Sequence, residues 1–382
     1  MRDGPTVGFK EAARTVAGFG LGGREQPEHV EVADAEWQAL TGKLWSEKLT
    51  GLAVAAFRAG VLRVSADRVD DLLDRHRRAM AWCLRIEQRL LLLDERFVGA
   101  GIEYAVLKGP AVAHTAYADP SLRGFGDLDV LVRGRDFERA CRVLREMGFR
   151  RNVPEPRQGF DARFGKAAAH RHEDDAMEID LHRTLVLGPF GLWIEPETLL
   201  DRAVGFRLAG RPIPRLDDTG MLLNVAMHAS LGWPPALIPW RDVLEISGGM
   251  SVDWGVLADQ ASRWRLSAVL HDAFATAERT LGCSPPPEAA IFAAARIPRD
   301  EARALGTYVG ERRRIGGTAV STLRAIPNVR DKAAYVRALA FPQRTFMDER
   351  YPTGSSSSYR GRLMTPGRWA WRRLTATRSK ER

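Results

Sequence analysis

The chain has 382 residues, with 57 lysines and arginines against 48 acidic residues, and a formal net charge of +9. A hydrophobic fraction of 45% and a charged fraction of 27% are typical of a globular protein with a buried core, and exclude disordered and fibrous classes. No segment approaches the ~18 consecutive apolar residues of a membrane span, and the N-terminus lacks the apolar stretch of a secretory signal. We therefore expect a cytoplasmic protein with no transmembrane segment.

The first hundred residues are expected to be helical. A short amphipathic segment around Trp37 and Leu52 comes first. A longer one begins near Ser65, a favourable helix N-cap, and carries apolar residues at helical spacing until Gly99 and Gly101 end it. The three cysteines in the chain form no C-x-x-C pair, so neither a disulfide framework nor a zinc knuckle is expected.

The hydrophobic period changes after Gly101. Short apolar, β-branched runs alternate with helical patterns, and Pro110 suits the first position of a helix, where its missing N–H leaves no gap. The expected order is strand 102–107, helix 110–117, strand 127–132, helix 136–147 and strand 177–182. Between the last two lies an irregular stretch, in which His170 and His172 are read as part of a solvated loop. These elements predict a compact α/β unit.

Helices dominate again after residue 217, separated by glycine, proline and serine. We expect an α+β fold, with a small mixed sheet embedded in N-terminal and C-terminal helices. The predicted regions are a helical region 1–100, an α/β core 101–215, a second helical region 216–350, and a serine linker with a basic tail 351–382. Residues 359–382 carry a net charge of +7, which leaves +2 for the rest of the chain. The tail is therefore expected to contact an acidic partner.

The sequence from Asp127 to Val132 contains the pattern with the clearest chemistry. Asp127 and Asp129 are two residues apart on a predicted strand, so their side chains share a face. Two carboxylates at that separation repel each other unless a cation lies between them. Magnesium, which prefers oxygen ligands, is the natural occupant. On this pattern alone, a surface Asp-x-Asp in a loop is equally compatible.

Asp180 adds a third carboxylate on another predicted strand, where Glu178 and His182 share its face. Three carboxylates on adjacent strands, beside a glycine turn that leads into a helix, are typical of phosphoryl and nucleotidyl transfer, in which metal ions neutralise a triphosphate. Glu178 is either a ligand or a paired surface acid. His182 either orients a carboxylate or is a half-buried structural histidine, and His228 is read as a core histidine.

These motifs resemble a known family. The segments are Leu107-Lys-Gly-Pro, Tyr117, Arg123, Gly126-Asp-Leu-Asp-Val-Leu-Val132 and Glu178-Ile-Asp-Leu-His182. Together they resemble the bacterial nucleotidyltransferase family, an uncharacterised branch of the polymerase beta-like nucleotidyltransferase superfamily. The resemblance by motif covers residues 100 to 185 and implies a nucleotidyltransferase core.

The resemblance implies roles for seven residues. Asp127, Asp129 and Asp180 would be the catalytic and metal-binding residues of a two-magnesium site, with Asp180 also helping to deprotonate the acceptor. Gly109 would let the backbone approach the phosphates, Lys108 and Arg123 would neutralise triphosphate charge, and Gly126 completes the nucleotide-binding set. One departure is Pro110, which cannot donate a hydrogen bond where the superfamily has a residue that can.

The implied activity is transfer of a nucleoside monophosphate from an NTP to a hydroxyl of a small molecule, a sugar or a modified peptide, in natural-product or polysaccharide tailoring. An NTP, whose base the sequence does not specify, is the expected co-substrate, and magnesium is the expected cofactor. Two alternatives remain open from the sequence. One is kinase-like phosphoryl transfer from the same site. The other is a non-catalytic protein on this scaffold that binds nucleic acid or an acidic partner, which the excess of arginine favours.

Overall fold

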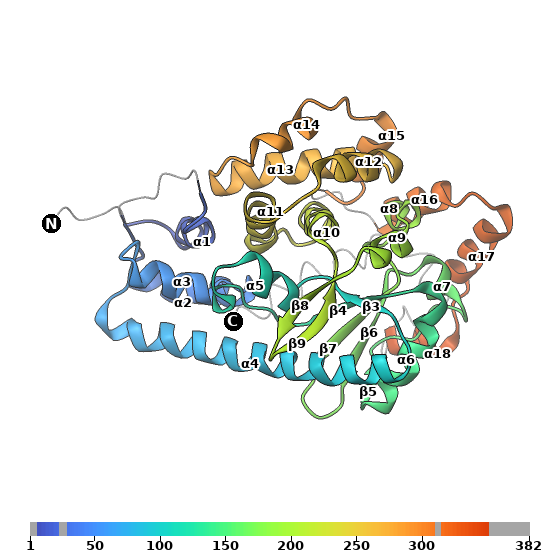
Figure 1. The fold of residues 1–382 in the computed structure, drawn as a ribbon, viewed down its shortest axis with the longest axis horizontal. Helices are drawn as coiled ribbons and strands as arrows, with labels where there is room; N and C mark the ends of the chain where they lie inside the picture. The colour runs from blue at the N-terminus through green and yellow to red at the C-terminus, as the bar shows by residue number, and fades with distance from the viewer. Residues whose placement is uncertain (1–5, 23–28, 310–314, 351–382) are drawn as a thin grey trace.

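The computed structural model describes residues 6–22, 29–309 and 315–350. Its N-terminal part is helical, apart from two short strands that pair in parallel. The elements are α1 (Phe9–Gly18), β1 (Val30–Glu31), α2 (Trp37–Ser46), α3 (Thr50–Arg58), β2 (Leu62–Arg63) and α4 (Ala66–Gly99). Helix α4 confirms the long helix expected after Ser65, and runs alongside the sheet from the N-terminal helices towards α6 (Figure 1).

The centre of the molecule is a seven-stranded sheet with strand order β5-β6-β7-β4-β3-β9-β8. Strand β4 is parallel to β7 and β3 is parallel to β9, whereas the other neighbours are antiparallel. The strands are β3 (Tyr104–Val106), β4 (Leu128–Val132), β5 (Phe149–Arg151), β6 (Ala167–His172), β7 (Glu178–His182), β8 (Val204–Leu208) and β9 (Arg211–Arg215). The sheet is mixed and surrounded by helices, which confirms the predicted α+β class.

Three predicted strands are present as β3, β4 and β7, and the other four strands of this sheet were not predicted. The stretch read as irregular contains β5 and β6, and His170 and His172 on β6 are buried, so the expected solvated loop is wrong for these two side chains. Helices between the strands are α5 (Pro110–Ala116), α6 (Phe137–Glu146), α7 (Phe160–Phe164), α8 (Pro189–Trp193) and α9 (Pro196–Asp201). The helices expected over 110–117 and 136–147 are confirmed as α5 and α6.

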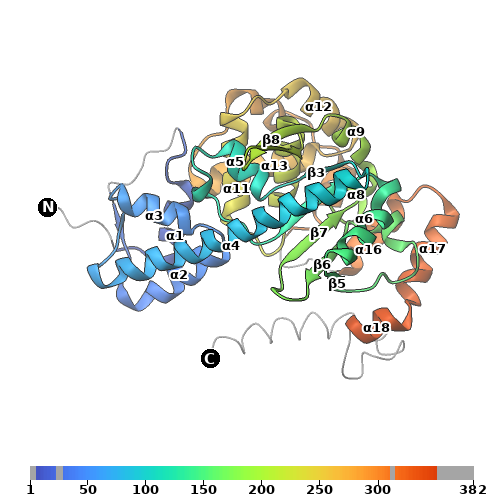
Figure 2. The ribbon, with the colours of Figure 1, turned by 60° about the horizontal axis from the view of Figure 1, so that its bottom comes forward.

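The C-terminal half is helical. Its elements are α10 (Asp218–Leu231), α11 (Leu237–Gly249), α12 (Trp254–Arg263), α13 (Ser267–Leu281), α14 (Ala290–Ala293), α15 (Arg299–Leu305), α16 (Ile315–Ala325), α17 (Val329–Ala340) and α18 (Arg344–Arg350). Helices α16 to α18 lie at the end of the molecule that carries α7 (Figure 1), and α16 lies next to α8 (Figure 2). Tyr335 of α17 stacks there on Phe160 of α7. The predicted region boundaries stay a prediction, and the serine linker and basic tail lie outside the described residues.

Among the helices that the structure describes, none combines the length and the apolar character that a membrane span requires. The core is continuous, since buried apolar residues from α1 to the segment after α15 belong to one cluster. Strand β4 lies at its centre, and Val130, Leu131 and Val132 have no exposed surface. A strand in the middle of a sheet is covered on both faces, so its polar residues stand out as exceptions.

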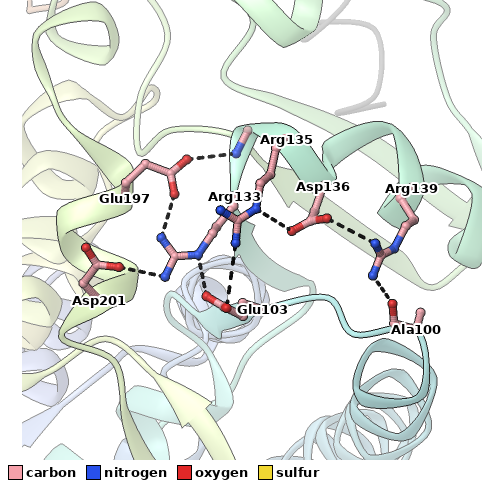
Figure 3. Close-up of polar contacts among 9 residues, drawn as sticks. Ala100, Glu103, Arg133, Arg135, Asp136, Arg139, Glu197 and Asp201 are labelled. Atoms are coloured by element: carbon pink, nitrogen blue, oxygen red, sulfur yellow. Dashed lines mark hydrogen bonds and ion pairs between the residues drawn. The ribbon is translucent and has the colours of Figure 1, made fainter.

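The C-terminal end of β4 leads into a network of ion pairs (Figure 3). Arg133 follows the strand and contacts three carboxylates, with Nη1 2.9 Å from Glu197 Oε2, Nη2 2.7 Å from Asp201 Oδ1, and Nε against Glu103. The carboxylate side chains remain half-exposed, between 51% and 63%. This network joins α9 to the starts of β3 and α6.

Candidate active site

The N-terminal end of β4 carries the carboxylates predicted from the sequence. The parallel register of β4 and β7 pairs Asp129 directly with Asp180. Their oxygens, together with a ring nitrogen of His182, lie within 4.8 Å of one another. Asp127 lies just before the strand, with 43% of its side chain exposed, and is not part of that group. The structure therefore brings Asp129 and Asp180 together and leaves Asp127 at the rim.

Lys108 connects the two carboxylates of β4. It follows β3, whose antiparallel pairing with β4 places it beside them. Its Nζ lies 2.6 Å from Asp129 Oδ2 and 3.5 Å from Asp127 Oδ2. The contact with Asp129 is an ion pair whose geometry does not meet that of a hydrogen bond. Asp129 Oδ2 is therefore buried without a hydrogen-bond partner. In this arrangement a lysine ammonium takes the place of the cation expected between the two acids.

His182 holds Asp129 from the other side. Its Nε2 lies 2.9 Å from Asp129 Oδ1, and its Nδ1 lies 3.1 Å from the carbonyl oxygen of Thr184. The ring is 3% exposed and is fixed between these two oxygens. Of the two interpretations open from the sequence, the structure therefore supports a histidine that orients a carboxylate. Glu178, by contrast, pairs with Arg171 at 3.4 Å, as a surface acid would.

The two adjacent carboxylates have opposite pKa shifts. Burial by itself would raise the pKa of Asp129, but the positive charge of Lys108 and the contact with His182 hold that pKa well below its usual range. Burial and the negative charge of Asp129 raise the pKa of Asp180. Asp129 is thus a persistent anion, and Asp180 is the better proton acceptor of the pair.

The donor set fits a hard divalent cation. Asp129 and Asp180 offer carboxylate oxygens within a short distance of each other, and Oδ2 of Asp129 is buried with no hydrogen-bond donor directed at it. Carboxylate oxygens are the ligands that magnesium prefers. His182 is already engaged with Asp129, so it supports a ligand rather than acting as one.

The turn between β3 and α5 has the conformation expected for a close backbone approach. Gly109 has φ 63° and ψ −116°, a region that favours glycine, and Pro110 begins α5 as predicted. A Cβ at Gly109 would lie 3.5 Å from the carbonyl oxygen of Asp127, which is ordinary contact. The backbone angle, rather than the available space, therefore explains the glycine. Its role in phosphate binding stays a prediction.

A lysine that was not predicted as a site residue, Lys48, lies beside Gly126. A Cβ at Gly126 would lie 2.9 Å from Nζ of Lys48, which sits in the turn between α2 and α3 with φ 62°. Helix α3 is packed tightly there, because a Cβ at Gly51 would lie 1.9 Å from the carbonyl oxygen of Ser121. Within the described residues, Lys48 makes no ion pair. The N-terminal helices thus place a cation beside the residue that precedes Asp127.

Arg123 does not contact the carboxylate group of β4 and β7. It is buried against α11, with Nη2 2.7 Å from Asp242 Oδ2 and Nε 3.3 Å from Asp242 Oδ1. Tyr117 also donates a hydrogen bond to Asp242, at 2.8 Å. Burial opposes the charged form of Arg123, yet the carboxylate raises its pKa further above the ordinary value. Its predicted role with triphosphate remains a prediction, since its charge is already paired.

Two further residues interact electrostatically with Asp129 from other elements. Lys166, just before β6, helps to lower the pKa of Asp129. His228 on α10 is exposed to solvent, so its predicted place in the core is wrong. Protein nonetheless surrounds the ring closely, and this burial, followed by the charge of Lys108, lowers the pKa of His228 to about 3.

Comparison with known proteins identifies the family. The model of a family described as uncharacterised nucleotidyltransferases matches residues 33–282, about two thirds of the chain. The chain belongs to this family. It is therefore a nucleotidyltransferase, as the motifs around Asp127 and Asp180 suggested. The matched range includes all seven site residues predicted from the sequence, and also Lys48, Lys166 and His228.

Three solved structures also match part of the chain. A lincosamide antibiotic adenylyltransferase bound to lincomycin is 15% identical, with 43% of this chain and 96% of that chain covered and a TM-score of 0.31. A nucleotidyltransferase-like protein from Paracoccidioides brasiliensis is 15% identical, with 53% and 94% covered and a TM-score of 0.35. The antibiotic-resistance factor ANT(2'')-Ia is 14% identical, with 50% and 94% covered and a TM-score of 0.31. No curated protein matches the chain.

Proposed function

We propose that this nucleotidyltransferase is metal-dependent and moves a nucleoside monophosphate from an NTP to a hydroxyl of a small molecule, a sugar or a modified peptide. The observation that carries the proposal is the register of β4 and β7, which sets Asp129 beside Asp180 within 4.8 Å. Lys108 supplies positive charge at Asp129, and Lys48 adds a second cation beside Gly126, the residue before Asp127. Such a combination suits a polyphosphate that must be neutralised and held in line.

The chain's own residues have separate tasks in this reaction. Asp127, Asp129 and Asp180 would hold magnesium, which supplies charge neutralisation of the triphosphate when it is bound. His182 keeps the Asp129 carboxylate in one orientation. The hydroxyl oxygen of the acceptor substrate forms a bond to the α-phosphorus of the NTP. Asp180 takes up the proton that this hydroxyl loses. The bond from that phosphorus to the bridging oxygen breaks, and pyrophosphate leaves with the electron pair.

The test is mass spectrometry of candidate acceptors after incubation with each NTP and magnesium. We expect an acceptor to gain the mass of one nucleoside monophosphate, with release of pyrophosphate. The double variant Asp127→Asn, Asp129→Asn should lose this product, whereas Asp201→Asn, a carboxylate in the Arg133 network, should retain it. Equal nucleotide turnover by the wild type and the double variant would refute the proposal.

The same experiment separates the kinase-like alternative. Phosphoryl transfer from this site would add one phosphate to the acceptor and release a nucleoside diphosphate instead of pyrophosphate. Chelation of divalent cations is a further check. Activity that persists in excess chelator would contradict the metal dependence even if the transfer product is found.

A further inference from the structure

A cavity of about 310 Å³ lies among α2, α10, α11 and α13. Two of its lining residues are neighbours of residues that surround the candidate active site. Glu47 lines the cavity and precedes Lys48, which lies against Gly126. Gly232 also lines it, and its N–H donates a hydrogen bond of 3.0 Å to the carbonyl oxygen of His228, one turn earlier on α10. The cavity therefore lies next to segments that carry Lys48 and His228.

A third wall closes the cavity from the side of β7. Tyr308 lines it, and its hydroxyl donates a hydrogen bond to the carbonyl oxygen of Leu187, in the segment that follows β7 and His182. A molecule in this cavity would thus be bounded in part by a residue that is fixed to the segment leading away from β7.

The walls of the cavity have two different chemical characters. Trp233 supplies an aromatic surface that is 52% exposed, which is unusual for so large an apolar side chain. Facing residues on α13 are polar, and recur at helical spacing as Asp272, Thr276 and Arg279. The neighbouring residues Ala273 and Ala277 on the same helix are buried in the core. One side of the cavity is therefore a flat apolar face, and the other is a row of hydrogen-bonding groups.

Most charges in the cavity are already engaged. Lys43 pairs with Glu47, and Arg279 donates a hydrogen bond to Thr276 at 2.8 Å. Asp272 makes no ion pair or hydrogen bond with any part of the chain that the structure describes. A free carboxylate of this kind accepts hydrogen bonds from two adjacent hydroxyl groups.

We propose that this cavity is the acceptor site, and that its ligand is a hydroxylated saturated ring, such as a pyranose or a cyclitol. Such a ring presents C–H bonds on a face, which suit Trp233, and hydroxyls around its edge, which suit Asp272 and Thr276. The cavity volume is at the lower end of the range for small-molecule sites. This inference rests on the proposed function, and narrows its acceptor to a sugar-like ring in preference to a peptide.

Saturation-transfer NMR with three defined probes tests the proposal. The probes are methyl glucopyranoside, methyl glucosaminide and myo-inositol, each measured with the full chain, and the peptide Gly-Ser-Gly represents a peptide acceptor. At least one ring probe should receive saturation, and the peptide should not. Saturation of the peptide alone, or of no probe, would overturn the proposal.

Substitutions of cavity residues test whether the ring probe binds in this cavity. Trp233→Ala and Asp272→Asn should each weaken the binding of the ring probe about tenfold or more. Trp45→Ala is the matched control, because Trp45 is 43% exposed but lies outside the cavity, and it should bind like the wild type. Thermal melting shows whether each variant is folded, and Trp233→Phe should retain most of the affinity. If Trp233→Ala binds the ring probe normally but loses ATP, the cavity holds the nucleotide and the assignment is wrong.

The double variant Asp127→Asn, Asp129→Asn separates this inference from the proposed function. It should bind the ring probe like the wild type while transferring no nucleotide. A wild type that binds the ring probe but turns over no NTP would refute the proposed function and leave the sugar-binding cavity standing. Transfer to an acceptor at an unchanged rate in Trp233→Ala would refute the acceptor site and leave the nucleotidyltransferase activity standing.

Discussion

The two ends of β4 show opposite ways of arranging charge. At its C-terminal end, Arg133 is surrounded by three carboxylates, all of which keep contact with water. At its N-terminal end, Asp129 is 2% exposed, its Oδ2 lacks a hydrogen bond, and Lys108 is shared between two acids. Both groups of charges flank the same buried strand. The difference in their exposure and pairing therefore comes from the charged residues and not from the strand.

This contrast separates a structural network from a functional one. Exposed ion pairs such as those of Arg133 cost little to desolvate and each contributes a small stabilisation. Burying Asp129 and Lys108 is costly, and a pair of well-packed uncharged residues would stabilise the fold equally well or better. Lys166 also acts on Asp129, and Lys48 lies against Gly126; neither lysine has a carboxylate partner within 4 Å among the described residues. An excess of unpaired positive charge beside buried acids is suited to a polyanionic ligand.

The largest expected effect comes from dismantling the Lys108–Asp129 pair. Lys108→Met alone leaves the Asp129 carboxylate buried without its counter-charge, so the free energy of unfolding should fall by about 3 kcal/mol. The double variant Lys108→Met, Asp129→Asn removes both charges and keeps a polar partner for His182. It should return to within about 1 kcal/mol of the wild type. Urea denaturation in the presence of a chelator measures both values.

Activity should not recover with stability. Pyrophosphate release by the double variant should stay about a hundredfold to a thousandfold below the wild type, because the carboxylate that faces the substrate is gone. Stability losses that simply add in the double variant would show that the two charges do not compensate each other. Retained activity would show that the charged groups at the N-terminal end of β4, like those around Arg133, have only a structural role.

Sequence patterns predicted the parts of the fold that have a strong local signal. Strands β3, β4 and β7 are apolar or alternating runs with β-branched residues, and Pro110 marked the start of α5. Strand β6 begins with three alanines, and β9 contains Pro212 and Pro214, both of which are unfavourable in strands. These strands form because neighbouring strands offer backbone partners, which local propensity does not reveal.

The residues of the candidate site also fall into those that local sequence patterns predict and those that they do not. Asp127, Asp129 and Asp180 were predictable because two-residue spacing on strands sets side chains on one face. Lys48 lies in the turn between α2 and α3, His228 lies on α10, and both reach the site only through tertiary packing. Arg123 was selected by its place in the motif, but its partner Asp242 lies on α11 and could not be inferred from the motif.

His182 provides the next test of the site end of β4. His182→Phe keeps the volume of the ring and removes its contact with Asp129, so activity should fall about tenfold to a hundredfold. The magnesium concentration for half-maximal activity should rise as well, because Asp129 is no longer held in one orientation. His182→Gln, which can still donate to Asp129, should recover part of the loss.

His170→Phe is the matched control for His182. His170 is similarly buried on β6, at 1% exposed, but its Nδ1 contacts only the carbonyl oxygen of Ala168. This variant should retain the magnesium dependence of the wild type. A shift in both variants would indicate a general disturbance of the sheet rather than a role of His182 in positioning Asp129.

The opposite end of β4 should respond in stability and not in activity. Arg133→Gln leaves Glu103, Glu197 and Asp201 close together without their shared cation. The free energy of unfolding should fall by about 1–2 kcal/mol, since three weak surface pairs are lost together. The NTP turnover number should remain that of the wild type. High salt should reduce the stability difference, as it screens exposed charges, and a loss of turnover would contradict the separation of the two ends.

The smallest expected effect concerns Lys48, the cation that the N-terminal helices add to the site. Lys48→Ala should raise the KM for NTP about fivefold, which corresponds to about 1 kcal/mol, because a half-exposed charge beside a phosphate contributes modestly. The turnover number and the melting temperature should change little, and Lys48→Arg should restore the KM. Lys332→Ala on α17 is the control, since that lysine is also half-buried but lies on a different part of the molecule. An unchanged KM in Lys48→Ala together with a fall in stability would contradict a role in NTP binding. Lys48 would then only stabilise the packing of the N-terminal helices against the loop before β4, and the excess of cations at this end of the strand would be smaller than the structure indicates.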